Sequence, residues 1–312
     1  MKLADAQALY IQQLQARGCA GTSIAGVLRM FAKSIGGERE LETILTSEVR
    51  TFLDGTRPLT RYWHRKHSAL LGFFRFAFVR SMVAHMPLPM HTPRCRQVFR
   101  PYIYTDDDVA RLIGAIDSLR TSRIERYSLR TLLVLLLGTG LRLSEALHLT
   151  LADVDLEQNL LIVRESKFYK TRLVPIGPDL VRILCTYVDA LHPSRGADPA
   201  SPLLVCRDGE PLTGSGTRRA FARLRSMTGL RRNDDLPNLP RLHDFRASFA
   251  VRRLTAWYRE GADVQKLLPL LSTYLGHVSI AATQVYLPLT PELLVEASAR
   301  FERYATLQGD QP

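Results

Sequence analysis

The chain has 312 residues, 46% of them hydrophobic, which is enough for two domains that each bury a core. Its 42 lysines and arginines outnumber 30 aspartates and glutamates, and the formal net charge of +12 favours a polyanionic partner. The longest apolar run, Leu132 to Leu137, is too short to span a bilayer. No signal peptide is recognisable, so we expect a cytoplasmic protein with no membrane partner. The four cysteines lie far apart without a CxxC pair, which argues against a zinc site.

Residues 1–86 are predicted to form an N-terminal helical domain. Apolar residues recur at i, i+3, i+4 and i+7 from Ile24 to Phe31 and again from Leu70 to Phe78, which is the spacing of one helix face. Two shorter helices are expected near residues 3–17 and 46–54. Together these segments indicate a bundle of about four helices.

The charge of the next stretch has one sign. Between Gly55 and Thr105 there is no acidic residue, whereas nine residues are lysine or arginine. Arg61 and Arg65 stand four residues apart on an expected helix, where like charges repel unless an anion faces them. Phosphate is the natural anion for such a face, so Arg61, Arg65 and Lys66 are candidate DNA contacts.

Residues 87–104 contain four prolines, a density that blocks helix formation and indicates an extended interdomain linker. A new helix is expected after Thr105, because Asp108 completes a start that resembles a capping box. We assign residues 105–288 to a second domain and residues 289–312 to a C-terminal helix or tail.

The second domain is predicted to be mainly helical with a small β-sheet. A buried helix is expected at 126–137, and a helical continuation from Ser144 to Leu151. The β-rich segments Leu160–Val163 and Arg172–Ile176 are separated by polar residues and indicate a hairpin. Further helices are expected from Pro178 to Leu191 and from Thr217 to Met227.

Two short polar motifs lie in this domain. Arg142 follows Gly140-Leu141 after the apolar helix, and Glu145 lies close enough to hold Arg142 or to cap the next helix. His243 and Arg246 are three residues apart, so on a helix both project from one face. Alone, Arg142 is equally compatible with a surface arginine at a helix start. His243 and Arg246 alone are equally compatible with a locally satisfied histidine and an arginine in solvent.

A third motif brings a histidine and a tyrosine together near the C-terminus. His277 follows Leu275-Gly276, and Tyr286 comes nine residues later. An ordinary half-buried tyrosine is the alternative, since only the spacing from His277 distinguishes Tyr286 from the other tyrosines nearby.

These residue types suit the attack of a tyrosine on a phosphodiester. A phenol with a pKa near 10 is barely ionised at neutral pH and needs a base. The attacked phosphate gains charge on its non-bridging oxygens, which arginine forks stabilise. The leaving 5′ oxygen needs a proton from a lysine or a histidine. The covalent phosphotyrosine conserves the bond energy, so we expect rejoining without ATP, metal or any other cofactor.

The order and spacing of these motifs resemble the tyrosine recombinase family, also called the phage integrases, which includes the Xer-type recombinases. The resemblance implies a SAM-like helical core-binding bundle followed by an α+β catalytic domain. It also implies site-specific DNA recombination through a 3′-phosphotyrosine and a Holliday junction. The matching segments are Thr139–Glu145, Lys170–Pro175, Leu242–Arg246, Leu275–His277 and Ala282–Tyr286.

The resemblance also implies roles for individual residues. Arg142 and Arg246 correspond to the arginines that clamp the scissile phosphate, and Tyr286 corresponds to the nucleophile. His243 corresponds to the histidine that assists proton transfer, and His277 to the one that hydrogen-bonds the phosphate.

The hairpin lysine is less sharply indicated. Relatives read Lys-Gly-x-Lys-x-Arg with the first lysine catalytic, whereas this chain reads Lys167-Phe-Tyr-Lys170-Thr-Arg172 and lacks the glycine. The register favours Lys167 as the acid that protonates the leaving oxygen, with Lys170 as the alternative. Lys170 and Arg172 are also candidate contacts to the DNA backbone.

The implied partners are a double-stranded recombination site and a tetramer of this chain, with or without a second recombinase. The C-terminal helix would either pack on its own domain or dock into a neighbouring protomer. Two other functions are open: a monomeric type IB topoisomerase, which shares the chemistry, and a DNA-binding relative without catalysis. The basic helical domain favours a recombinase, and the full set of catalytic residue types argues against an inactive protein.

Overall fold

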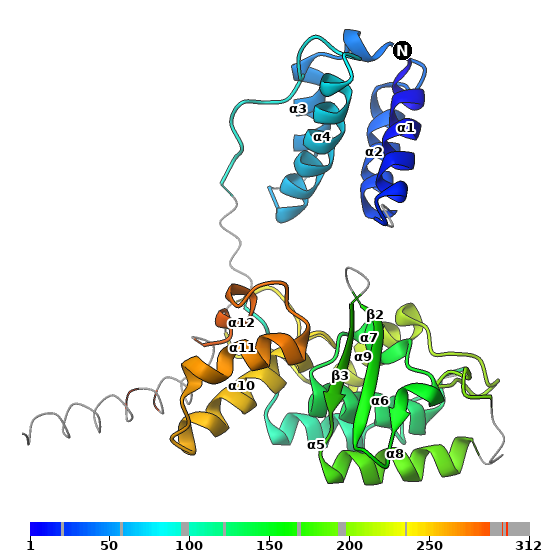
Figure 1. Cartoon of the computed structure of the whole chain (residues 1–312), viewed down its shortest axis with the longest axis vertical. Coiled ribbons are helices and arrows are strands. Elements are labelled where there is room, and N and C mark those ends of the chain that lie inside the picture. The colour runs from blue at the N-terminus through cyan, green and yellow to red at the C-terminus, as the bar shows by residue number, and fades with distance from the viewer. Residues whose placement is uncertain are drawn as a thin grey trace, which may run out of the picture. The chain divides into compact units, whose positions relative to one another are not determined.

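The computed structural model contains two compact units, Met1–Val98 and Phe99–Pro312, whose boundary falls inside the proline-rich stretch (Figure 1). None of the helices in the described part of the chain is long and apolar enough to cross a membrane. The tail predicted at 289–312 lies outside the described residues, apart from Val295 and Ser298. The structure describes residues 1–19, 22–56, 59–94, 100–120, 123–166, 170–192, 198–234 and 236–287, together with those two residues.

The first unit is a helical bundle, as the apolar periodicity predicts. Thr60 directly precedes its last helix. The Thr60 hydroxyl accepts a hydrogen bond from the Tyr62 backbone N–H at 3.2 Å and so caps the first turn. The elements are α1 (Leu3–Ala16), α2 (Thr22–Ile35), the 3₁₀ turn η1 (Leu41–Thr43), α3 (Thr46–Asp54) and α4 (Arg61–Val79).

Aromatic side chains fill the core of this unit. Phe31 of α2 meets Phe74 of α4 edge to face, with 6.1 Å between ring centroids, and both side chains are fully buried. Trp63 is also buried, and its indole N–H donates to Asp54 at 2.8 Å, which ties the start of α4 to the end of α3. Full burial of one large apolar side chain contributes roughly 1.5–3 kcal/mol, so this cluster accounts for much of the stability of the unit.

The second unit is mainly helical with one small antiparallel sheet of strand order β1-β2-β3. The central helix α6 is buried along most of its length and packs against α8 and α10. Figure 1 shows α10, α11 and α12 gathered beside the β3 edge of the sheet, where α11 contacts β3. The helices are α5 (Asp106–Gly114), α6 (Arg126–Thr139), α7 (Leu143–Leu147), α8 (Pro178–Leu191), α9 (Gly214–Met227), α10 (Asp244–Arg259), α11 (Val264–Leu275) and α12 (Ala281–Gln284). The other elements are η2 (Leu151–Asp153), β1 (Val154–Asp155), β2 (Leu160–Ser166) and β3 (Lys170–Pro175).

Two local predictions have different outcomes. The capping box before α5 is confirmed, because the Thr105 hydroxyl accepts from the Asp108 N–H at 3.1 Å and the Asp108 carboxylate accepts from the Thr105 N–H at 3.0 Å. The helix predicted from Ser144 to Leu151 is wrong beyond Leu147. There the Asp153 carboxylate binds the Thr150 N–H at 3.0 Å, which starts a 3₁₀ turn instead.

Two glycines end the helices that lead into the polar motifs. Gly140 terminates α6 at φ +63°, and a Cβ there would lie 2.6 Å from the Phe249 ring. Gly276 terminates α11 at φ +66°, and a Cβ there would lie 2.9 Å from the Arg172 guanidinium. Both positions combine a left-handed backbone with a close contact, so only glycine fits. The chain can therefore turn sharply just before Arg142 and His277.

Candidate active site

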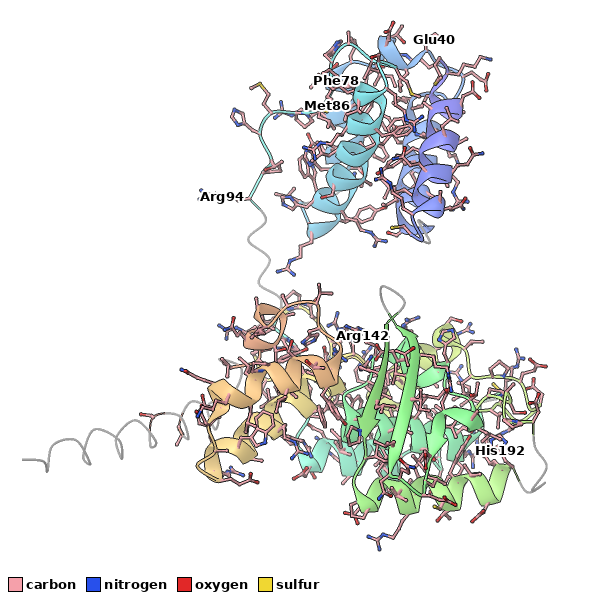
Figure 2. The ribbon with its side chains drawn as sticks, in the orientation of Figure 1. Glu40, Phe78, Met86, Arg94, Arg142 and His192 are labelled. Atoms are coloured by element: carbon pink, nitrogen blue, oxygen red, sulfur yellow. The ribbon has the colours of Figure 1, made fainter. Side chains whose placement is uncertain are left out.

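Arg142 lies at the N-terminus of α7, beside the hairpin and the segment that holds α11 and α12 (Figure 2). Its backbone N–H donates to the Glu145 carboxylate at 2.9 Å, and its Nη1 donates to the other carboxylate oxygen at 2.6 Å. Its Nη2 donates to the Gly276 carbonyl at 2.8 Å. Glu145 therefore both caps α7 and orients the Arg142 side chain, so the two expectations for this carboxylate hold together.

A second arginine reaches the same carboxylate from β3. Arg172 donates through Nη1 and Nη2 to the two Glu145 oxygens at 3.1 and 2.8 Å, a bidentate fork. Its Nε donates to the Tyr274 carbonyl at 2.9 Å. The Glu145 side chain is only 6% exposed, so one buried carboxylate holds two guanidinium groups.

This arrangement keeps Glu145 ionised. Burial alone would raise the pKa of its carboxyl group, but hydrogen bonds from Arg172 and from the Arg142 backbone lower that pKa to about 2. A neutral glutamic acid would lose much of its attraction for both arginines. The network is therefore intact throughout the neutral pH range.

Arg246 of α10 is 2% exposed and bridges the ends of two other helices. Its Nη1 donates to the Gly140 carbonyl at 2.8 Å, and its Nη2 donates to the Leu275 carbonyl. Burial and the nearby positive charge of Arg142 lower its pKa to about 10, so the side chain stays positive at neutral pH.

His243 stands at the N-cap of α10, one turn before Arg246. Burial and the charge of Arg246 lower the pKa of its imidazole, so the ring is neutral at pH 7 and can accept a proton. Asp244 has a different task, because its buried carboxylate accepts from the backbone and the guanidinium of Arg241 at 2.9 and 3.0 Å. Asp244 therefore stabilises the start of α10.

His277 follows α11 and lies beside Tyr286. Its Nδ1 is 2.7 Å from the Thr283 hydroxyl, and its ring centroid is 6.0 Å from that of Tyr286. Burial, together with the positive charges of Arg246 and Arg142, lowers the pKa of His277 to about 4.

Tyr286 is 8% exposed and packs with the side chains of α10 and α11. The two histidines, two arginines and tyrosine that the spacing singles out thus lie in one region.

A sequence model of the phage integrase family matches residues 103–292. The chain belongs to this family of tyrosine recombinases. It is 42% identical over 258 residues to integrase/recombinase y4rB, a protein so named in Sinorhizobium fredii, covering 80% of each chain. It is 29% identical to the tyrosine recombinase XerD of Staphylococcus aureus, over 70% of this chain and 68% of XerD.

The fold is also that of the tyrosine recombinases. A lambda integrase tetramer bound to a Holliday junction superposes with a TM-score of 0.69 at 18% identity, covering 92% of this chain and 77% of the integrase. The predicted fold class, mainly helical with a small sheet, is therefore confirmed. Family and fold together support site-specific DNA recombination.

Only some of the hairpin residues lie within the described part of the chain. Lys167 lies outside the described residues, and Lys170 begins β3 with a side chain that also lies outside them. Arg172 was predicted to contact the DNA backbone, but its N–H groups are directed to Glu145 and Tyr274. Spacing could not reveal these contacts, because Arg172 and Tyr274 are 102 residues apart in the chain.

The candidate DNA contacts of the first unit differ from one another. Arg61 and Arg65 are exposed on α4, and Arg65 donates to the Ser23 hydroxyl at 3.1 Å. Lys66 is 9% exposed, and its ammonium donates to the carbonyls of Phe52 and Leu53 at the end of α3. Lys66 is therefore better placed to stabilise α3 than to contact DNA.

A basic pocket of about 510 Å³ adjoins Arg142. Two of its arginines, Arg218 and Arg225, come from α9, a helix that the sequence predicts but that no motif connects to the site. The pocket suits an anionic ligand, and the DNA backbone on either side of a scissile phosphate is such a ligand. Its polar lining includes Arg142, Arg218, Arg225, Arg241 and His243.

Proposed function

We propose that this recombinase cleaves and rejoins DNA through attack of the Tyr286 hydroxyl on a phosphodiester, without metal or ATP. The Tyr286 oxygen forms a bond to phosphorus, the bond to the 5′ oxygen breaks, and a 3′-phosphotyrosine results. The observation that carries the proposal is that Arg142 and Arg246 bind the Gly276 and Leu275 carbonyls, directly before His277. The His277 ring lies 6.0 Å from that of Tyr286, and His243 lies one turn before Arg246.

In this mechanism, Arg142 and Arg246 bind the non-bridging oxygens. Each guanidinium has five N–H donors, and the contacts to backbone carbonyls and to Glu145 use two on each side chain. The remaining donors are available to an oxyanion in fixed directions. Preorganised donors of this kind stabilise the charge that develops in the transition state.

The histidines would handle protons and orientation. His243, held neutral by burial and by Arg246, accepts the tyrosine proton. The Thr283 hydroxyl can donate to Nδ1 of His277, which selects the tautomer with a proton on Nε2. That Nε2–H would then donate to the phosphate. Lys167 would protonate the 5′ oxygen, with Lys170 as the alternative acid.

We further propose that four copies act on two DNA sites and exchange strands through a Holliday junction. The lambda integrase tetramer bound to such a junction has the same fold, which supports this assembly. A second recombinase is not required by any feature of the described residues.

The test begins with the DNA that the protein attaches to in cells. Sequencing DNA recovered with the covalent complex supplies the target, from which a nicked substrate is made that traps the adduct. Wild type and Tyr258→Phe should form the adduct, whereas Tyr286→Phe should bind the same DNA and form none. An adduct that survives in Tyr286→Phe would remove this tyrosine from its role.

Removing metal ions tests a separate part of the proposal. Adduct formation on the same substrate should proceed at an unchanged rate in EDTA, because arginines and histidines supply the charge and the protons. Strong inhibition that added Mg²⁺ reverses would contradict the metal-free mechanism.

A further inference from the structure

The C-terminal end of α11 is held by three arginines from three different elements. Backbone carbonyls at this end of a helix lack partners within the helix and carry partial negative charge, so guanidinium groups stabilise them. Arg172 of β3 donates to Tyr274 at 2.9 Å, Arg246 of α10 to Leu275, and Arg142 of α7 to Gly276 at 2.8 Å.

Arg172 differs from the other two because it also binds Glu145 with both terminal nitrogens. Each Glu145 oxygen is shared, one between Arg172 and the Arg142 side chain, the other between Arg172 and the Arg142 backbone N–H. The Arg172 side chain is 11% exposed. Its Nε, Nη1 and Nη2 thus all donate to protein groups.

The fit at this point is tight. Gly276 allows the Arg172 guanidinium to lie directly against the backbone, since a Cβ would come within 2.9 Å of Nη1. The next residue is His277, which contacts Thr283 in the segment that leads to Tyr286. Displacement of the guanidinium would therefore disturb both Glu145 and the backbone that carries His277.

We propose that Arg172 is a positioning residue that fixes Arg142 through Glu145 and fixes the α11 end that carries His277. The inference rests on the proposed function, because it assigns a task in orienting groups around the scissile phosphate. Without Arg172, Glu145 keeps its contacts to Arg142 but loses the guanidinium that holds it in place. The Glu145 and Arg142 side chains could then move together. Buried polar networks lose geometric definition when one member is removed. Displacement of a catalytic group by about 1 Å can slow a reaction by about 100-fold.

A direct DNA contact is the competing role for Arg172. Three of the five N–H groups of Arg172 are already used within the protein and its side chain is 11% exposed, so a phosphate could be reached only by the two that remain. The two roles differ in their salt dependence. Loss of a phosphate contact lowers the slope of log affinity against log salt by about 1, whereas loss of a positioning residue leaves that slope unchanged.

The rate experiment uses Arg172→Lys, which keeps the charge but cannot form the fork, and the salt experiment uses Arg172→Gln, which removes the charge. The matched control is Arg130→Lys on α6, where the arginine pairs with Asp117 at 2.9 Å away from the site. With the nicked substrate, Arg172→Gln should bind DNA with the salt slope of wild type. Arg172→Lys should bind DNA with the affinity of wild type and form the adduct roughly 10- to 100-fold more slowly. Arg130→Lys should match wild type in both measurements.

A second arm separates positioning from general destabilisation. A methylphosphonate at the scissile position removes one negative oxygen and so reduces the need for Arg142. The defect of Arg172→Lys relative to wild type should shrink several-fold on this substrate, whereas a defect caused by partial unfolding would stay the same. A Glu145→Gln/Arg172→Lys double variant should be slowed by less than the product of the two single effects, because both changes act in part through Arg142.

The outcomes are distinct. An Arg172→Lys rate equal to wild type, a lowered salt slope in Arg172→Gln or an undiminished Arg172→Lys defect on the methylphosphonate would each overturn the positioning role. Absence of any adduct in wild type would instead overturn the proposed function.

Discussion

The candidate functional arginines of the two units are placed in opposite ways. In the first unit, Arg61 and Arg65 are exposed on α4, and Arg65 also donates to the Ser23 hydroxyl. In the second unit, Arg246 is almost completely buried, and Arg172 is nearly so. An exposed guanidinium keeps its hydration and attracts phosphate at long range, with a strength that depends on salt. A buried one must have its N–H groups satisfied by fixed partners, which leaves it in one orientation.

Under the proposed function, the charge that attracts DNA and the charge that acts on the scissile phosphate come from different arginines. The exposed arginines would provide affinity that tolerates small movements. Buried arginines provide direction, because carbonyls at the ends of α6 and α11 and the Glu145 carboxylate set their positions. Substitutions in the two sets should therefore affect different measurements.

The largest effect is expected in the buried set. Arg246→Lys keeps one positive charge but cannot donate to Gly140 and Leu275 while also binding phosphate. Adduct formation at saturating DNA should fall by roughly 100- to 1000-fold, the usual cost of losing an oxyanion donor. The matched control is Arg252→Lys on the same helix, where the arginine pairs with Asp106 at 2.7 Å. Cleavage by Arg246→Lys within a few-fold of wild type would show that this guanidinium does not act on the phosphate.

The exposed set should affect binding alone. Arg61→Ala/Arg65→Ala should weaken DNA binding by roughly 10- to 100-fold near 0.1 M salt and lower the salt slope by about 2. Adduct formation at saturating DNA should stay unchanged. Arg50→Ala, a change to an exposed arginine of α3 that pairs with Asp54, serves as control. A double variant with the wild-type salt slope would mean that DNA does not meet this face of α4.

Lys66 provides the sharpest contrast with its neighbours. Lys66→Met removes the donor to Phe52 and Leu53 and should destabilise the protein by about 1–3 kcal/mol. The salt slope of DNA binding should not change, because this ammonium is buried. Urea denaturation and binding titrations of the full chain measure the two quantities. Unchanged stability together with a lower salt slope would return Lys66 to the DNA-contacting set.

The smallest effect concerns His277. Its folded-state pKa of about 4 lies below the ordinary value of 6.5, so the unfolded chain binds this proton more readily. The stability that it contributes is complete above pH 6.5 and is lost as pH falls toward 4. Between pH 7 and pH 5, wild type should lose about 1 kcal/mol more than His277→Asn, after allowance for partial exposure of the ring. Equal losses in urea denaturation at the two pH values would contradict the depressed pKa.

Much of the fold follows from local sequence signals. Apolar spacing predicts the helices of the first unit, and Thr105 with Asp108 predicts the start of α5. The helix predicted to Leu151 fails because Asp153, a residue outside that segment, binds Thr150. Local spacing therefore succeeds where the capping residues lie inside the segment considered.

The grouping of site residues is also foreseeable, but their contacts are not. Spacing and residue type single out Arg142, Arg246 and Tyr286. The burial of Lys66 depends on carbonyls 13 and 14 residues away, and the task of Arg172 depends on a carbonyl 102 residues away. Such contacts arise from tertiary packing, which no short motif encodes.

The most direct measurement is to identify the residue that becomes attached to DNA. The trapped adduct would be digested with protease and nuclease, and the remaining nucleotide-linked peptide sequenced by mass spectrometry. We expect a single linked peptide that carries a 3′-phosphate on Tyr286. Linkage to another side chain such as Tyr274, or to a 5′-phosphate, would contradict the account.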